Sequence, residues 1–275
     1  MAYSTQRTWP ITVVLAVASV PLLLMYAWLF IDTVTDTAPG SVFPNRFTLE
    51  HWRFLVDAPR TPDGIWPIAL NTLLFALATS LAILFISSTA GYALSRLAMP
   101  YRRMFLAGML ILHAFPTITL IIATFLILNF LGLYNTLIGV ILVKASLELP
   151  FGIWIMKGFY DTVPWEIEMA GIADGASRFR VWRELVLPMV GPGILALGVF
   201  SFLSGWSEFI LPQVLAPDSR VMVLSVYLAS LISDDSNFDF NLFKSVGLFY
   251  IFPVIILYLF FQKHLMNIYG GGSKG

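Results

Sequence analysis

Six long apolar stretches constrain this chain more than any other feature of its sequence. Each reaches or approaches the ~20 residues that a helix needs to cross a ~30 Å hydrocarbon core. The stretches are residues 11–31, 68–94, 104–130, 136–156, 187–211 and 245–261. Charged residues make up only 12% of the chain, against ~25% in an ordinary soluble domain. We therefore predict an all-α, polytopic membrane protein with six transmembrane helices in a single transmembrane domain, residues 1–275.

The first apolar stretch has the features of a retained helix. It follows a single basic residue, Arg7, and no small-residue cleavage pattern precedes Asp32, so a signal peptide is not expected. The chain also contains no cysteine, which excludes disulfides and thiol chemistry from its mechanism.

The distribution of charge predicts the orientation in the membrane. With the N-terminus inside, most of the basic residues fall in cytoplasmic segments. These are Arg7, Arg96, Arg102, Arg103, Lys157, Arg178, Arg180, Arg183, Lys263 and Lys274. The outer segments are rich in acids instead: Asp32, Asp36, Glu50, Asp57, Asp63, Asp218, Asp234, Asp235 and Asp239. The positive-inside rule then gives an N-in, C-in topology.

Two outer segments lie between the predicted helices. Residues 32–67 are rich in Pro and Gly, which favour turns and short elements. Residues 212–241 form a polar outer loop that is acidic near its end and long enough to meet an extracytoplasmic partner.

The second and third stretches carry features of helix packing and bending. Small and hydroxyl-bearing residues at 87–91 allow close contact between helices in lipid. Pro116 lies ~18 Å along the third stretch, so we expect a kink near the bilayer centre, either for gating or for packing. His113, without a second ligand at metal-binding spacing, is interpreted as a polar group satisfied at a helix interface.

Charged residues interrupt two of the predicted spans. Lys144 and Glu148 are spaced i, i+4 on one helix face and lie ~12 and ~18 Å from its outer end. Charges at such depth face a bundle interior or a wet cavity. This pair either lines a solute path or neutralises itself and orients the helix. Ser204 and Glu208, beside Trp206, either contribute to that path or lie at the outer interface, where Trp is common.

A charged segment, residues 162–188, separates the fourth and fifth spans. Pro164 suits a first helical turn, and Gly175 after Asp174 suits the left-handed residue that ends a helix. Ser177 can cap a second short helix, and Pro188 returns the chain to the membrane. By periodicity alone the segment is either an amphipathic hairpin on the lipid surface or a docking element; its acidic first turn favours docking.

The same segment resembles the cytoplasmic signature of the inner-membrane permease subunits of binding-protein-dependent ABC importers, in the carbohydrate branch that includes maltose-type permeases. That signature runs Glu-Ala-Ala, three further positions to Gly, and on to Leu-Pro. The matching residues are Ala170, Asp174, Gly175, Ala176, Ser177, Leu187, Pro188 and Pro192. Met169 stands where the family usually has Glu, Gly171 stands at the second Ala, and Glu168 lies one place upstream. Residues 69–73, 93–97, 131–136, 206–209 and 270–275 also resemble the family.

The resemblance implies a cytoplasmic coupling helix and an assembly. In that family, six helices pack against a homologous second permease. The coupling helix docks in a groove of a cytoplasmic ABC ATPase dimer, which binds ATP and Mg, and outer loops meet an extracytoplasmic solute-binding protein. Coupling is carried onto Glu168, Ala170, Asp174, Gly175 and Pro188, and the ATPase contact of the tail, residues 262–275, onto Lys274. The implied solute is a sugar, a di- or oligosaccharide, and the implied location is a bacterial or archaeal inner membrane.

The residues also argue against other classes of function. No Gly-x-x-x-x-Gly-Lys-Ser/Thr motif occurs, so the chain has no nucleotide site of that type, and we expect no cofactor, metal or nucleic-acid partner. The alternative is a stand-alone secondary carrier or channel, which the charges at Lys144, Glu148 and Glu208 favour. Such carriers often contain inverted repeats, and none is detectable. A membrane-bound enzyme is a third class, for which the spacing gives no support.

Overall fold

The computed structural model describes residues 9–36, 44–59, 61, 63–232 and 239–270, with side chains up to residue 262. Within these residues, four helices are long and apolar enough to cross a membrane. They are α1 (Trp9–Thr33), α2 (Ile65–Arg96), α5 (Leu137–Asp161) and α12 (Phe240–Gly270). Two bent helix pairs bring the number of candidate spans to as many as six. The chain is thus mostly helical, as predicted, while the count of six and the orientation remain predictions.

The third apolar stretch is broken rather than kinked. It forms α3 (Arg102–His113) and α4 (Thr117–Phe130), whose axes differ by 96°. Pro116 is the N-cap of α4; its ring cannot continue a preceding helix and its nitrogen has no proton to donate. The predicted position of the bend is confirmed, but one continuous helix over 104–130 is wrong.

The fifth stretch is also interrupted. After α6 (Trp165–Ala173) come α7 (Arg178–Val181), the π-helical turn η2 (Trp182–Val186) and α8 (Leu187–Met189). A 74° bend then leads into α9 (Gly191–Trp206). Proline suits the first turn of a helix because its missing N–H is not needed there, and Pro192 occupies that turn of α9. The predicted span at 187–211 therefore starts too early and ends too late.

The chain contacts group into two compact units: residues 1–65 with 230–251, and residues 66–229 with 252–275. In the first unit, β1 (Thr35–Asp36) pairs antiparallel with β2 (Arg46–Phe47), followed by the 3₁₀ turn η1 (Glu50–Leu55). These confirm short elements within residues 32–67.

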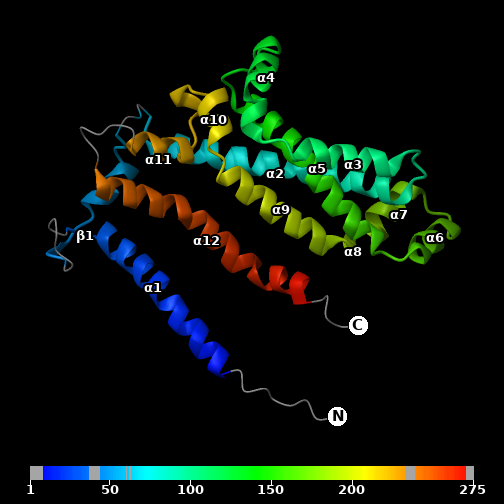
Figure 1. Cartoon of the computed structure of the whole chain (residues 1–275), viewed down its shortest axis with the longest axis horizontal. Helices are drawn as coiled ribbons and strands as arrows, with labels where there is room; N and C mark the ends of the chain where they lie inside the picture. The colour runs from blue at the N-terminus through cyan, green and yellow to red at the C-terminus, as the bar shows by residue number, and fades with distance from the viewer. Residues whose placement is uncertain (1–8, 37–43, 60, 62, 233–238, 271–275) are drawn as a thin grey trace. The chain divides into compact units, whose positions relative to one another are not determined.

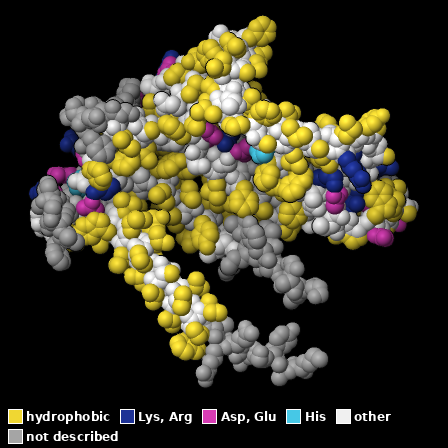
Figure 2. Space-filling view, viewed as in Figure 1, with side chains coloured by type: hydrophobic (Ala, Val, Ile, Leu, Met, Phe, Trp, Pro, Cys, Tyr) yellow, Lys and Arg dark blue, Asp and Glu magenta, His cyan; other side chains and the backbone are white. Residues whose placement is uncertain are grey.

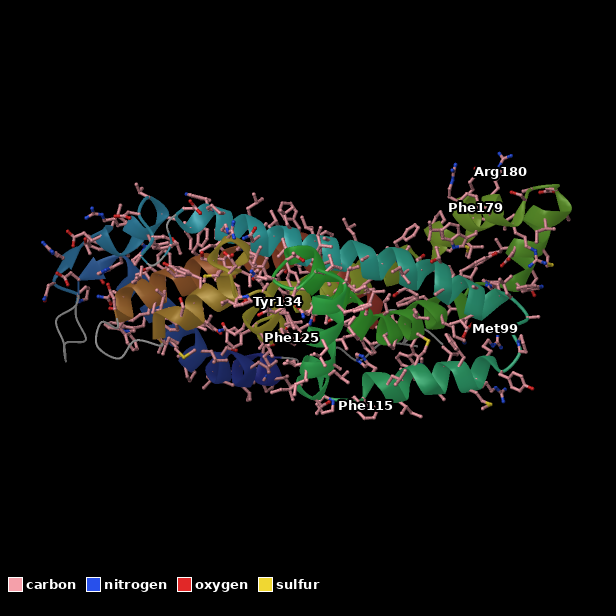
Figure 3. All side chains as sticks on the ribbon, turned by 90° about the horizontal axis from the view of Figure 1, so that it is seen from above. Met99, Phe115, Phe125, Tyr134, Phe179 and Arg180 are labelled. Carbon is pink, nitrogen blue, oxygen red and sulfur yellow. The ribbon has the colours of Figure 1, made fainter. Side chains whose placement is uncertain are left out.

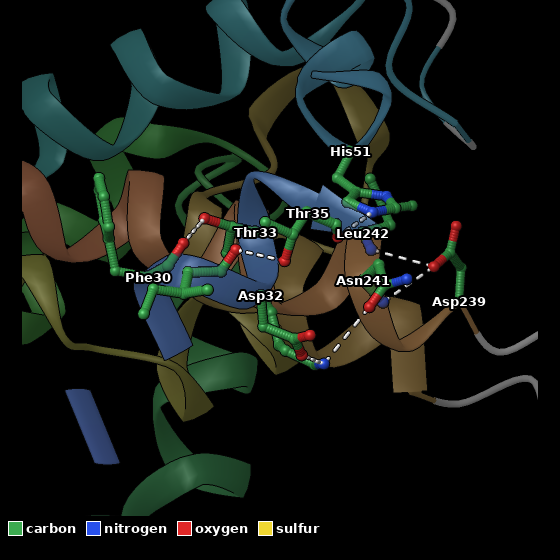
Figure 4. A network of polar contacts seen from close by, with 10 residues as sticks. Phe30, Asp32, Thr33, Thr35, His51, Asp239, Asn241 and Leu242 are labelled. Atoms are coloured by element: carbon green, nitrogen blue, oxygen red, sulfur yellow. Dashed lines mark hydrogen bonds and ion pairs between the residues drawn. The ribbon is translucent and has the colours of Figure 1, made fainter. Parts of the chain in front are cut away.

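Polar contacts hold this first unit together (Figure 4). Lys244, on α12, bonds to Asp32 at the end of α1. The carboxylate of Asp239 accepts from the backbone nitrogens of Asn241 and Leu242 at 2.9 and 3.0 Å, which caps the first turn of α12. Capping satisfies backbone donors that a helix leaves unpaired.

In the second unit, α3 and α9 both pack against α5, and Figure 1 shows α2 running along the same bundle. The contacts are close because glycines face neighbouring helices. A Cβ on Gly91 of α2 would lie 2.8 Å from the Cβ of Met156 on α5, and one on Gly193 of α9 would lie 2.4 Å from the ring of Phe159. The close helix contact predicted for residues 87–91 is thus confirmed.

Residues 212–241 are not the polar loop that was predicted. They include part of α10 (Ile210–Leu215), the 3₁₀ turn η3 (Ser219–Val221) and α11 (Leu224–Ile232). Buried side chains from them, among them Leu215 and Val223, pack with Phe75 and Leu128 in one apolar cluster. At the same end of the unit, Phe125 and Tyr134 pack edge to face at 4.9 Å (Figure 3). The prediction failed because these apolar helices are short and are separated by Pro, Ser and Asp residues, so the sequence contains no long hydrophobic stretch here. Asp234 and Asp235 lie outside the described residues.

The turn η3 is held by a local ion pair. Asp218 caps it by accepting from the backbone nitrogen of Arg220 at 2.9 Å, and its own nitrogen donates to the side chain of Asn135 at 3.0 Å. The guanidinium of Arg220 lowers the pKa of the Asp218 carboxyl to about 2. The capping carboxylate is therefore charged at neutral pH.

Candidate functional site: the coupling loop and a buried polar cluster

The loop between α5 and α9 forms two short helices with caps at the predicted residues. Helix α6 begins after Pro164, which is its N-cap, and ends at Ala173. Gly175 follows with φ +86°, a conformation that costs glycine little because it has no Cβ. Ser177 then accepts a hydrogen bond from the backbone nitrogen of Arg180 at 3.4 Å and starts α7. The two-helix reading of residues 162–188 is confirmed.

Helix α6 has one exposed face. Residues four and seven or eight apart lie on the same side of a helix, and Glu166, Ala170, Ala173 and Asp174 are all exposed. The exposed face therefore carries two small residues between two carboxylates.

The opposite face of α6 is packed within the chain. Gly171 is buried, and a Cβ there would lie 2.8 Å from Leu185 and 3.0 Å from Val181. Glu168, a candidate for the acid that meets the ATPase, is only 1% exposed. Its side chain points toward its own chain, so it presents no carboxylate to the outside. Met169 lies between the two faces, partly buried.

The carboxylate of Glu168 is held by two residues at the end of α2. The hydroxyl of Tyr92 donates to its Oε1 at 2.6 Å. The Nε of Arg96 lies 3.1 Å from its Oε2, and both side chains are almost fully buried. Neither residue was singled out from the sequence for this role. Their i, i+4 spacing at the end of the second predicted span was the available signal, but their partner lies far away in sequence.

Basic residues gather where this loop lies, at the end of the second unit that carries α6 and α7 (Figure 2). Figure 3 shows Phe179 and Arg180 at this end, which also carries Met99 of the loop between α2 and α3. The basic segments 96–103 and 178–183 therefore lie at the same end of the second unit, and which side of the membrane this end faces stays a prediction.

A second polar cluster lies deep between α5 and the segment after α9. The Nζ of Lys144 is 2.9 Å from the Oε1 of Glu148 and 2.6 Å from the Oε2 of Glu208. The hydroxyl of Ser204 donates to Glu148. The Lys144–Glu148 pairing was predicted. The ion pair between Lys144 and Glu208 was not predicted, because the sequence left Glu208 either on the solute path or at the outer interface.

A cavity of about 130 Å³ opens onto this cluster. It is lined by Leu112, His113, Phe115, Thr117, Lys144, Leu147, Glu148, Glu208 and Leu211. Acidic, basic and His side chains accordingly appear side by side within an apolar face (Figure 2). His113 bonds through Nδ1 to the carbonyl of Leu147 at 2.9 Å and stacks on Phe151, as the interface reading predicted. Trp206, in contrast, is 3% exposed and stacks on Phe202; the interfacial reading of this residue is wrong.

Comparison with known proteins identifies the chain. Residues 85–266 match the family model described as "Binding-protein-dependent transport system inner membrane component". The match covers the coupling loop and the polar cluster. The chain belongs to this family. It is therefore a membrane-embedded permease component of a transport system, and its class is that of a transporter rather than an enzyme.

Two curated relatives cover most of this permease. It is 29% identical to the diacetylchitobiose uptake system permease protein NgcG of Streptomyces coelicolor, over 94% of this chain and 84% of that protein. It is also 29% identical to the maltodextrin transport system permease protein MdxG of Bacillus subtilis, over 85% and 83% of the two chains. Among solved structures, a bacterial ABC transporter involved in the import of the acidic polysaccharide alginate has a similar fold. Its TM-score is 0.77 at 21% identity, covering 96% of this chain and 99% of that one.

Proposed function

We propose that this permease forms half of an ATP-driven import pathway for a sugar, a di- or oligosaccharide, in a bacterial inner membrane. The sugar class is supported by the relatives, which are permeases for diacetylchitobiose and maltodextrin. The observation that carries the mechanism is the coupling loop, whose first helix buries one face against the chain and leaves the other exposed.

The exposed face of α6 is the proposed docking surface for a cytoplasmic ABC ATPase. Ala170 and Ala173 have no long side chains and allow a partner backbone to approach closely. Glu166 and Asp174 flank them and favour basic groups on the partner. These two acids take the anchoring role in this proposal, since Met169 has no charge and Glu168 faces inward. Ala176 and Pro188, which were also predicted as coupling residues, belong to the same loop, and no direct ATPase contact is assigned to them in this proposal.

The buried polar cluster is the proposed part of the solute path. Lys144, Glu148, Glu208 and Ser204 offer donors and acceptors suited to sugar hydroxyls. A cavity of about 130 Å³ is smaller than the ~300–1,000 Å³ of typical ligand pockets. This chain therefore supplies one wall of a site, and a homologous second permease supplies the other.

The remaining partners belong to the same proposal. An extracytoplasmic solute-binding protein delivers the sugar to the outer side, in line with the family description. ATP and Mg bind to the ATPase, which switches the pathway between outward and inward access. The predicted tail contact at Lys274 lies outside the described residues and stays a prediction.

Replacing Gly175 by Val tests the docking surface. No atom lies within 4 Å of the Cβ position in the free chain, so valine meets no steric clash there, but the φ of +86° costs roughly 1–2 kcal/mol of backbone strain. The substitution adds bulk beside Asp174. We expect normal membrane insertion but weaker co-purification with the ATPase and loss of ATP-driven uptake.

The matched control is Gly132→Val. Gly132 also has a positive φ, +68°, and open space around its Cβ position, but it precedes α5 at the other end of the unit. The variant has the same kind of backbone strain as Gly175→Val but lies away from the docking surface. ATPase binding should therefore persist. If both variants bind the ATPase like the wild type, the docking surface is wrong.

Reconstitution distinguishes this function from a stand-alone carrier, which the buried charges at Lys144, Glu148 and Glu208 would otherwise favour. Vesicles that hold this chain alone should take up no labelled maltodextrin or chitobiose. Uptake should require the co-purified permease and ATPase partners, ATP and a binding protein. Sugar uptake by the chain alone, driven by an ion gradient, would establish the carrier instead.

A further inference from the structure

The burial of Glu168 requires an explanation that docking does not give. It is a carboxylate on a nine-residue helix at one end of the second unit, yet it is 1% exposed while Glu166, two residues earlier, is open to solvent. Removing a carboxylate from water is costly unless a charge and hydrogen bonds compensate for it.

Both oxygens of Glu168 are directed at α2. Oε1 accepts from the hydroxyl of Tyr92, and Oε2 faces the Nε of Arg96 at 3.1 Å. Among the described residues, neither Oε2 nor this Nε makes a hydrogen bond, so the contact between the two atoms is an ion pair only. At this contact each side chain supplies the opposite charge that the other lacks.

Arg96 also holds the start of α6. Its Nη2 donates to the carbonyl of Val163 at 2.5 Å, and its guanidinium lies 5.2 Å from the ring centre of Trp165. A cation over an indole face is attracted by the ring. One side chain at the end of α2 thus contacts Val163, Trp165 and Glu168.

The second half of the loop reaches the same face of α2. Ser88, one turn before Tyr92, shares a hydrogen bond of 2.8 Å with the hydroxyl of Tyr160. That hydroxyl accepts from the indole nitrogen of Trp182, in the π-helical turn, at 3.1 Å. Tyr92 packs on the ring of Tyr160 at 5.6 Å.

Ser88, Tyr92 and Arg96 are spaced i, i+4, i+8 and form one polar stripe along α2. We propose that this stripe, anchored by the Arg96–Glu168 ion pair, makes the coupling loop and α2 move as one body. ATPase motion then passes into α2 as well as into α9. Glu168 is a positioning residue in this scheme and does not contact the ATPase. The inference rests on the proposed function of the loop.

The test measures sugar uptake and ATP hydrolysis in the same vesicles, with the complete complex and its binding protein. Glu168→Gln leaves Arg96 buried without a counter-charge. We expect the complex to assemble and hydrolyse ATP, while sugar transported per ATP falls about tenfold or more, because the ion pair no longer holds the loop to α2. Arg96→Gln should lower the sugar transported per ATP by a similar factor.

Two further variants separate coupling from folding. The double variant Glu168→Gln with Arg96→Gln leaves no unpaired charge, so it should be more stable than either single variant while its transport per ATP stays low, because the ion pair is still missing. Tyr92→Phe removes one hydrogen bond and should lower the ratio by a smaller factor. If Glu168→Gln fails to fold, an unchanged ratio in Tyr92→Phe still overturns the proposal.

The matched control is Glu184→Gln in the same loop. Glu184 pairs with Arg180 at 2.9 Å, but both side chains are exposed, so the ratio should equal that of the wild type. A wild-type ratio in Glu168→Gln would reject the positioning role, and so would loss of ATPase binding, because Glu168 would then act as a docking contact. A wild-type complex without ATP-dependent uptake would instead reject the proposed function.

Discussion

Lys144 has more partners in the fold than its place in the sequence indicates. From the sequence it has one partner, Glu148, one turn away on the same face. In the structure it has two, because Glu208 approaches from the segment after α9. One ammonium group therefore compensates two carboxylates that are each largely buried.

Replacing Lys144 by Met should destabilise the permease strongly. It leaves Glu148 and Glu208 buried without a cation, which costs about 3–5 kcal/mol when one partner of a buried pair is removed. The readout is the midpoint of thermal unfolding in detergent. Adding Glu208→Gln to Lys144→Met should restore part of the loss, because it removes one uncompensated charge.

Lys157→Met is the control for this prediction. Lys157 forms the same kind of i, i+4 pair on the same helix, with Asp161, but the Asp161 side chain is 45% exposed. Water solvates the carboxylate that remains, so we expect a loss of about 1 kcal/mol or less. Equal losses at Lys144 and Lys157 would contradict the special role of the deep cluster.

At the scale of elements, the helices of the second unit are arranged by close approach at glycines and by two sharp breaks. The break at Pro116 is visible in the sequence because proline ends a helix there. The approach of α2 to α5 is less visible, since any of the chain's 19 glycines would suit a helix contact. Only at some does a neighbouring helix fill the Cβ position.

Gly91→Ala should separate α2 from α5 and reduce stability. The new Cβ would lie 2.8 Å from the Cβ of Met156 and 2.9 Å from the backbone nitrogen of Lys157, and backbone atoms cannot move aside cheaply. Overpacking of this kind typically costs about 1–3 kcal/mol. Thermal unfolding in detergent should therefore show a lower midpoint for Gly91→Ala than for the wild type.

Gly158→Ala, on α5 itself, provides the comparison. No atom lies within 4 Å of its Cβ position, and alanine is the better helix former by about 1 kcal/mol. This variant should be as stable as the wild type or more so. A loss at Gly158 equal to that at Gly91 would mean that close contact is not the cause.

For the whole molecule, orientation in the membrane is the property that charge predicts and the fold leaves untested. The absence of native cysteine makes this prediction directly measurable. Ala98 and Ser219 are both exposed in loops of the second unit and should lie on opposite sides of the membrane.

In intact cells, a membrane-impermeant thiol reagent should label Ser219→Cys and leave Ala98→Cys unlabelled. Both should react after the membrane is opened with detergent, which controls for accessibility of the thiol itself. The reverse pattern would overturn the N-in topology.

The features that could be predicted from the sequence are those that depend on neighbouring residues along the chain. Apolar length predicts the spans at α1, α2, α5 and α12, and Gly175 and Ser177 mark the helix ends of the coupling loop because caps depend on neighbouring backbone groups. The family signature around Gly175 likewise indicated a permease. The apolar helices α10 and α11 were missed because they are short and their burial depends on distant segments.

In the coupling loop, a single helix, α6, shows which features follow from the sequence and which depend on the tertiary structure. Its sequence by itself determined where α6 begins and ends and that it carries acids in its first turn. Only the tertiary structure decided which acid faces outward. Glu168 turns toward Tyr92, 76 residues away in sequence, and Glu166 stays exposed. Hydropathy and caps are set by neighbours along the chain, whereas the pairing of buried charges depends on which helices pack together.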